Sequence, residues 1–139
     1  MSNREIKKYD EKNNLIYFKN LFGYERWIEY NENNKKIHSK DNNSLEVWYK
    51  YDEYGNLIYH KESTGYKEEN EVDENSRRIY TKKGRDSINH EMWYKYDING
   101  KQISITKEEF EERKLKREKQ LERLNRNYNK YSRFEIMDI

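Results

Sequence analysis

Short runs of alternating apolar and polar residues follow one another through most of the chain, and clusters of Asn, Asp and Gly separate them. The stretches 15–19 (LIYFK) and 24–30 (YERWIEY) are typical of these runs. In the second stretch, alternation places Trp27 on one side of a strand and Ile28 with Tyr30 on the other. Runs of this kind, rich in Tyr, Trp and Ile and bounded by turn-forming residues, predict short β-strands joined as hairpins.

The same pattern returns at a fixed interval. A Tyr or Val followed by Asp or Asn recurs three times at a spacing of 21 residues and once more after 24, in the pairs Tyr9-Asp10, Tyr30-Asn31, Tyr51-Asp52, Val72-Asp73 and Tyr96-Asp97. The fourth residue after each Tyr or Val is a turn former, at Asn13, Asn34, Gly55, Ser76 and Gly100. The seventh is isoleucine, at Ile16, Ile37, Ile58, Ile79 and Ile103. An internal repeat of this length indicates five stacked hairpin units.

Each of the first three units contains a second turn former, fourteen residues after its start, at Gly23, Ser44 and Gly65. Trp27 and Trp48 share one position of the repeat, and Trp93 takes it again after an insertion in the fourth unit. Residues 1–105 are therefore predicted to form an antiparallel meander of about ten short strands, which makes the fold mainly β with a C-terminal α-helix. Because both faces of the strands carry aromatic and charged residues, a twisted, largely single-layered sheet fits the pattern better than a closed barrel.

The period of the pattern changes after residue 105. Thr106 and Glu109 have the spacing of a capping box, in which the Thr hydroxyl accepts a hydrogen bond from the backbone N–H near Glu109 and the Glu side chain reaches back. Acidic residues in the first turns and basic residues later suit the helix dipole. We predict a helix from about Lys107 to Asn127, within a second segment, 106–139, that packs on the sheet or projects from it.

The apolar stripe of this helix is uneven. Its members are Phe110, Leu121, Leu124, Tyr128 and Tyr131, which could lie against the sheet or against a partner. The stripe also passes through Lys114 and Arg117, so the middle of the helix is expected to stand in solvent. The tail 132–139 (SRFEIMDI) is expected either to dock as another strand or to stay unordered.

Charged residues make up 40% of the chain, yet 29 basic and 27 acidic residues leave a net charge of only +2. This balance argues against an acidic mimic of nucleic acid and against a dedicated phosphate-binding protein. The absence of Cys excludes disulfides and thiolate metal sites. No apolar run approaches the roughly 20 residues of a membrane-spanning helix, and no signal peptide is recognisable, so a cytoplasmic location is expected. Abundant Asn, Lys, Glu, Ile and Tyr, which have AT-rich codons, suggest a bacterial host or its phage.

The segment Tyr51–Ile58 (YDEYGNLI) resembles a YD repeat, the tandem hairpin unit of bacterial RHS proteins. The resemblance covers roughly residues 9–110 and includes a period near 21 residues. Short arrays that close with a segment like 105–110 (ITKEEF) resemble small accessory proteins of bacteria and their phages. The resemblance implies a scaffold rather than an active site, and five units are too few for the closed shells of large RHS proteins.

His38, His60 and His90 are the side chains that could act as a general acid or base, or bind a metal. They form no HxxxH or HExxH motif and no Asp–His cluster. The chain also has no Gly-rich phosphate loop and no GxSxG elbow. We therefore expect hairpin histidines, with no enzymatic activity, no cofactor and no metal site.

Departures from the repeat are where partner contacts are expected, because the scaffold accounts for the regular positions. In the third unit Glu69 replaces the expected Trp and Val72 the expected Tyr, and the fourth unit has an insertion around 83–90. The candidate partner-binding residues are Trp27, Trp48, Trp93, Tyr66, Glu69, Lys83, Arg85, Asp86, His90, Arg113, Lys116 and Arg117. Repetition of the tryptophans at one structural position argues first for cross-strand packing, and the alternation of basic residues with Glu argues first for a solvated helix face.

These observations, together with the resemblance, favour a non-enzymatic protein that binds and inhibits another protein. In a phage or mobile element, the expected partner is a bacterial RNA-guided nuclease or its ribonucleoprotein complex, blocked in its nucleic-acid or substrate groove as by an anti-CRISPR protein. A toxin-immunity protein is the nearest variant. The alternatives are a nucleic-acid-binding accessory protein that uses the aromatic sheet and the basic stretch 113–126, and a structural protein that forms dimers or larger assemblies through its sheet edges.

Overall fold

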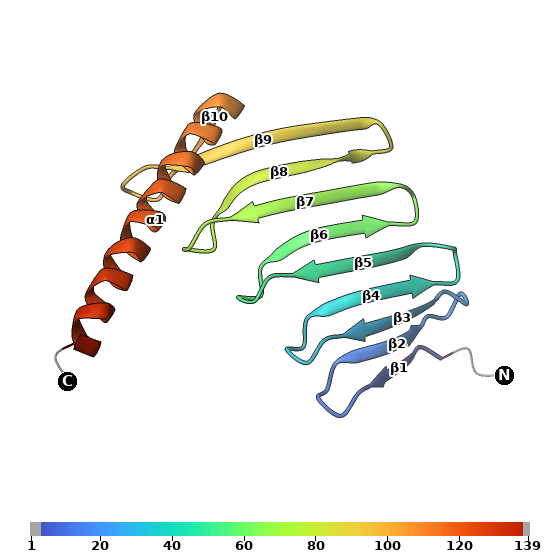
Figure 1. The fold of residues 1–139 in the computed structure, drawn as a ribbon. Helices are drawn as coiled ribbons and strands as arrows, with labels where there is room; N and C mark the ends of the chain where they lie inside the picture. Colours follow the sequence, from blue (N-terminus) through green and yellow to red (C-terminus); the bar gives the residue numbers. More distant parts are fainter. Residues whose placement is uncertain (1–3, 138–139) are drawn as a thin grey trace. The chain divides into compact units, whose positions relative to one another are not determined.

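The computed structural model describes residues 4–137, with side chains to residue 130. Ten antiparallel strands follow one another in chain order in an open meander, and a single helix comes last (Figure 1). The strands are β1 (Ile6–Tyr9), β2 (Leu15–Lys19), β3 (Glu25–Tyr30), β4 (Lys36–Asp41), β5 (Glu46–Tyr51), β6 (Leu57–Glu62), β7 (Tyr66–Val72), β8 (Arg78–Arg85), β9 (Ile88–Tyr96) and β10 (Gln102–Ile105), and the helix is α1 (Lys107–Met137). The predicted fold class is confirmed.

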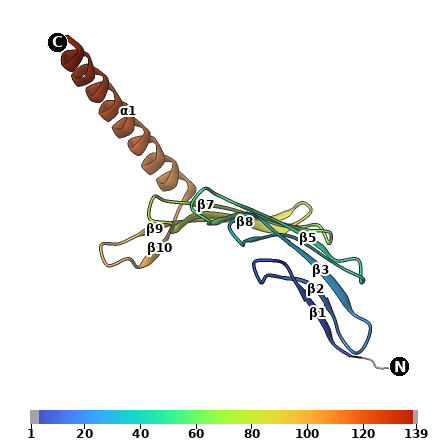
Figure 2. The same ribbon diagram turned by 90° about the horizontal axis from the view of Figure 1, so that it is seen from below.

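The chain divides into two compact units, residues 1–92 and 93–139. In the first unit the strands form one twisted layer, which is visible in Figure 2. The second unit contains the end of β9, β10 and α1. In its described residues, 4–92, the first unit consists of this sheet alone, without a second layer of its own.

Five turns share one geometry, because each begins with the Asp or Asn of the repeated pair. In the turn after β5, Asp52 Oδ1 accepts hydrogen bonds from the backbone N–H groups of Tyr54, at 3.0 Å, and Asn56, at 2.8 Å. The residue three positions after the Asp or Asn has φ between 60° and 87°, at Asn13, Asn34, Gly55, Ser76 and Gly100. A tight turn requires left-handed backbone at this position, and Gly and Asn adopt it most readily. The turn positions predicted from the repeat are therefore confirmed.

The second set of turns is also where the repeat places it. Gly23, Ser44 and Gly65 have φ of 85°, 69° and 94°. Successive turns are bonded to each other across the repeat: the Asn42 side chain donates to the carbonyl of Gly23 at 2.8 Å, and Ser63 Oγ donates to that of Ser44 at 3.0 Å. These bonds between neighbouring hairpins compensate for a thin apolar core.

The core is small. Only three apolar side chains are buried among the described residues, Ile28, Val47 and Phe110, at 5%, 7% and 8% exposure. Ile28 and Val47 lie on the same face of β3 and β5, each opposite Ser39 of β4. The predicted placement of Ile28 and Trp27 on opposite faces of β3 is confirmed.

Tyrosine hydroxyls bind backbone carbonyl groups on the neighbouring strand. Tyr30 Oη donates to the carbonyl of Leu15 at 2.9 Å, and Tyr51 Oη, one repeat later, donates to that of Lys36 at 2.7 Å. Val72 holds the same repeat position in β7 and has no hydroxyl. Asn70 supplies the hydrogen-bond donor instead: its Nδ2 donates to the carbonyl of Leu57, which corresponds in the repeat to those of Leu15 and Lys36, at 3.4 Å.

The insertion in the fourth unit lengthens a hairpin. Strands β8 and β9 have 8 and 9 residues, more than any of β1–β7, and a short turn at Asp86, with φ of 55°, joins them. Gly84 lies so close to the backbone of Ile88 and Asn89 that a Cβ atom there would collide with it. The extra residues thus extend the strands, and Gly84 allows their close approach.

Helix α1 begins at the predicted cap, since the backbone N–H of Glu109 donates to Thr106 Oγ1 at 3.2 Å. Phe110 is buried, and Lys95 Nζ binds Glu109 Oε1 at 2.7 Å. The helix continues past the predicted end at Asn127 to Met137, so for residues 132–137 both expectations, a further strand and an unordered tail, were wrong. No Gly or Pro interrupts this stretch, and each Asn or Ser costs a helix less than about 0.7 kcal/mol. Residues 138–139 and the side chain of Tyr131 lie outside the described part.

Candidate partner-binding surfaces

Cross-strand pairing assigns the side chains of the first unit to two faces. One, which we call the tryptophan face, carries Tyr17, Trp27, His38, Trp48 and Tyr59. The other, the hollow face, carries Ile28, Val47, Tyr49, His60 and Tyr66.

The tryptophan face begins with Trp27 of β3. Its ring lies 5.8 Å from that of Tyr17, its cross-strand partner in β2. Tyr17 is fixed in turn by a hydrogen bond from its hydroxyl to Glu25, at 3.1 Å, and by the Lys8 ammonium group, 5.1 Å above its ring. Trp27 remains 43% exposed. Cross-strand packing therefore holds the indole without covering it.

The equivalent pair one repeat later is His38 and Trp48, whose rings stack at 5.7 Å. His38 lies between two carboxylates: Nδ1 is 3.2 Å from Glu29 and Nε2 is 2.8 Å from Glu46. Partial burial lowers the pKa of His38. The hydrogen bonds that His38 makes with Glu46 and Glu29, and the negative charges of these two residues, outweigh the effect of burial, so the pKa of His38 lies above its ordinary value. Lys61 lies 5.6 Å from the centre of the Trp48 ring on the same face.

In the third repeat the aromatic pair is lost. Glu69 stands in the tryptophan position, between Tyr59 and Lys82. The next tyrosine of this face, Tyr80, donates to Glu91 at 3.2 Å, and burial together with this carboxylate raises the pKa of Tyr80 to about 12. The tryptophan face thus changes from aromatic to charged toward β8.

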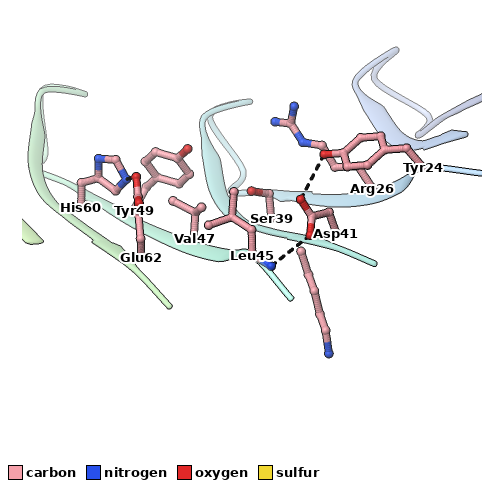
Figure 3. A pocket seen from close by; sticks show the side chains of 10 residues that line it. Tyr24, Arg26, Ser39, Asp41, Leu45, Val47, Tyr49, His60 and Glu62 are labelled. Atoms are coloured by element: carbon pink, nitrogen blue, oxygen red, sulfur yellow. Dashed lines mark hydrogen bonds and ion pairs between the residues drawn. The ribbon is translucent and has the colours of Figure 1, made fainter. Parts of the chain in front are cut away.

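The hollow face contains an open depression of about 250 Å³ (Figure 3). Its lining residues are Tyr24, Arg26, Ser39, Lys40, Asp41, Leu45, Val47, Tyr49, His60 and Glu62. Lys40 pairs with Trp27 and so directs its side chain to the other face. Asp41 is held by the turn that it starts and by the Tyr24 hydroxyl, at 3.2 Å. The depression offers aromatic, apolar and charged groups of both signs.

The three histidines do not meet. His60 lies on the hollow face, where its ring stacks on Tyr49 at 5.1 Å and meets the edge of Tyr66 at 5.7 Å. His38 lies on the tryptophan face, and His90 is exposed in β9. Among the side chains described, those of residues 4–130, no three His, Cys, Asp or Glu are grouped as a metal ion would need.

The predicted partner-binding residues are divided among several places. Trp27, Trp48 and Glu69 share the tryptophan face, whereas Tyr66, Lys83 and Arg85 share the hollow face, where Lys83 is opposite Glu68 and Arg85 is opposite Tyr66. Asp86 is in the β8–β9 turn, and His90 and Trp93 are in β9. Arg113, Lys116 and Arg117 are exposed on α1.

The sequence alone did not single out the residues of β2, β4 and β6 that pair with the tryptophan position of the following strand. Tyr17, His38, Tyr59 and Tyr80 are spaced by the same 21 residues as the repeated pairs. Aligning this position as well would have identified these partners, because Tyr17, His38 and Tyr59 lie opposite the tryptophan position of the next strand.

No model of a known protein family matches the chain, and no curated protein is similar to it. The resemblance to YD repeats therefore stays a prediction that depends on the repeat itself. None of the helical segments described is both long and apolar enough to cross a lipid bilayer.

Proposed function

We propose that the chain is a non-enzymatic protein-binding module that inhibits another protein, in a phage or mobile-element system directed against bacterial defence. Its partner is a bacterial RNA-guided nuclease, whose nucleic-acid or substrate groove it occupies in the manner of an anti-CRISPR protein. The observation that carries the proposal is the aromatic row on the tryptophan face, with charges of both signs beside it. The row consists of Tyr17, Trp27, His38 and Trp48.

The row has the properties of an interface centre. Trp and Tyr are enriched among residues that dominate protein–protein binding energies, and they lose little conformational entropy when bound. Trp27 is fixed by Tyr17 and is still 43% exposed. The row crosses four neighbouring strands, β2–β5, a width of roughly 14 Å at about 4.8 Å per strand.

The charges on this face favour a protein over a nucleic acid. Lys8 and Lys61 lie over aromatic rings, while Glu29 and Glu46 hold His38. A nucleic-acid backbone presents charge of one sign, so carboxylates in the middle of the surface would oppose it. Charges of both signs fit a protein surface, on which they determine specificity and register.

The test mixes the full chain with purified, guide-loaded bacterial RNA-guided nucleases and measures target cleavage and co-elution in size-exclusion chromatography. The expected result is slower cleavage at equimolar inhibitor and a shared elution peak with at least one nuclease. The Trp27→Ala variant is expected to bind about 30-fold more weakly, which corresponds to a loss of roughly 2 kcal/mol at an interface hot spot.

Tyr54→Ala is the matched control, because Tyr54 is an aromatic residue that is 78% exposed on a turn rather than on the tryptophan face. It should bind like the unmodified chain. Unchanged cleavage and separate elution with every nuclease would contradict the proposed function. Equal losses for the two variants would contradict the role of the tryptophan face.

A further inference from the structure

The helix α1 carries a continuous stripe of basic side chains. Residues three and four apart lie on one side of an α-helix, which turns about 100° per residue. Five cations follow this spacing without interruption and are all exposed: Lys116, Lys119, Arg123, Arg126 and Lys130. We call them the basic stripe. At about 1.5 Å per residue, the stripe is roughly 21 Å long.

The charge of α1 is strongly segregated along its length. Residues 107–112 contain one basic and four acidic side chains, whereas residues 113–130 contain eight basic and two acidic ones, a net charge of +6. The whole chain has a net charge of +2. The positive charge of the molecule is therefore concentrated in this part of the helix.

Neither carboxylate of residues 113–130 interrupts the basic stripe. Glu118 and Glu122 lie roughly 80–120° around the helix from its centre. The exposed apolar residues Leu121, Leu124 and Tyr128 lie on nearly the opposite side. Glu112 lies on the line of the stripe one turn before Lys116, so a partner that contacts the five cations from Lys116 onward avoids the carboxylates of Glu118 and Glu122.

We propose that the basic stripe of α1 binds duplex DNA through its phosphate groups. This goes beyond the inhibitory function, which is assigned to the tryptophan face of the first unit. The stripe carries no aromatic side chain that could stack on the bases of a single strand, and duplex DNA presents a phosphate charge about every 1.7 Å along its axis. A helix about 10–12 Å wide also fits the major groove of B-DNA, about 12 Å across, but not the narrow major groove of duplex RNA.

A lipid surface fits the helix less well. A helix that lies in a membrane interface inserts a wide apolar face below its basic residues. On α1 the stripe of Leu121, Leu124 and Tyr128 also contains Lys114 and Arg117, whose charges would enter the acyl boundary with it. Binding to anionic vesicles is thus the outcome that would replace duplex DNA as the partner.

The test titrates the full chain into a labelled DNA duplex of about 30 base pairs and follows anisotropy between about 50 and 200 mM salt. With three to five phosphates neutralised, log Kobs should fall against log salt with a slope between about −2.7 and −4.5. The stripe variant Lys119→Gln/Arg123→Gln/Arg126→Gln should bind at least about tenfold more weakly, with a slope shallower by about 2 to 3.

The control variant Arg113→Gln/Lys114→Gln/Arg117→Gln removes the same charge from another side of the same helix and should change affinity less than about threefold. Gln is a good helix former, and circular dichroism verifies the helix in both variants. Equal losses for the two variants would show dependence on net charge alone and overturn the proposal. No duplex binding at low salt, or tighter binding to single-stranded DNA, duplex RNA or anionic vesicles, would also overturn it. None of these results depends on nuclease inhibition.

Discussion

The regular hairpins and the β7–β8 hairpin fill the same repeat positions with different residues, and the comparison separates two kinds of departure. On the hollow face, the tyrosine hydroxyl that Tyr30 and Tyr51 supply is replaced by the amide of Asn70. The carbonyl at this repeat position, that of Leu57, still accepts a hydrogen bond although no tyrosine donates it. This departure is compensated within the sheet, so its irregular sequence is no evidence of a binding site.

The departure on the tryptophan face is different. Glu69 removes the aromatic pair and places a carboxylate between Tyr59 and Lys82. Nothing in the β7–β8 hairpin restores an indole there, so the surface itself changes from aromatic to charged. This departure alters an exposed face, and it marks where the aromatic row of the tryptophan face ends.

The largest effect should come from the small core of the regular hairpins. Ile28→Ala removes one of the few buried apolar side chains and should lower the free energy of unfolding by about 2–4 kcal/mol, as large-to-small core changes do. Urea unfolding measures the loss. Ile16→Ala, at a position that is 36% exposed, should cost clearly less. Equal losses would mean that burial on the hollow face does not hold the hairpins together.

The tyrosine hydroxyls should come next. Tyr51→Phe leaves the carbonyl of Lys36 without its partner at 2.7 Å and should cost about 1 kcal/mol, the usual net value of such a bond. Tyr9→Phe is the matched control, because Tyr9 has the same repeat position in the edge strand β1 but is 52% exposed. We expect the urea midpoint of Tyr9→Phe to equal that of the unmodified chain. A comparable loss at both positions would mean that the bond from the Tyr51 hydroxyl to the Lys36 carbonyl makes no specific contribution to stability.

The repeat made most of this fold predictable from sequence. Turn positions such as Gly55 and Gly23 were found because left-handed backbone restricts the residue type, and a fixed period shows the restriction several times. The start of α1 was predicted for a similar reason, since the cap at Thr106 needs a particular side chain at a particular place.

The candidate surfaces were predictable only in part. Alternation assigns Trp27 to a face, but it does not say that Tyr17 and Trp27 are cross-strand partners, which depends on register. Nor does alternation reveal that the Asn70 amide donates the hydrogen bond for which Val72, at the tyrosine position two residues later, has no hydroxyl. The end of α1 was misplaced because nothing stops a helix sharply where Gly and Pro are absent.

A smaller effect should follow pH at His38. Because contacts with Glu46 and Glu29 raise its folded pKa, protonation stabilises the folded state. This contribution is fully present below the unfolded pKa, about 6.5, and is lost as pH rises through the folded pKa. The stability gap between the unmodified chain and His38→Gln should therefore be larger near pH 6 than near pH 8 in urea unfolding.

Tyr17→Phe supplies the comparison for that experiment. Tyr17 has the equivalent position one repeat earlier, and burial, then Glu25, raises its pKa above the ordinary value of 10. Its stability gap should be the same near pH 6 and pH 8, since the hydroxyl does not titrate there. A gap for His38→Gln that also stays constant would show that the histidine contributes through stacking on Trp48 alone.

The smallest net effect should come from converting the departing hairpin into a regular one. Asn70→Ile alone removes the amide's bonds to the Leu57 carbonyl, at 3.4 Å, and to Glu68, at 3.1 Å. It also removes the buried Asn70 Oδ1, which accepts no hydrogen bond, so the net loss should stay below about 1 kcal/mol. Adding Val72→Tyr gives β7 the same Ile and Tyr that β3 has at Ile28 and Tyr30, and the new hydroxyl can reach that carbonyl. The double variant should therefore lie within about 1 kcal/mol of the unmodified chain, and the cycle formed with Val72→Tyr alone should show favourable coupling. Additive losses in urea unfolding would mean that Asn70 has a role of its own, and that the two hairpins differ by more than an exchanged hydrogen-bond donor.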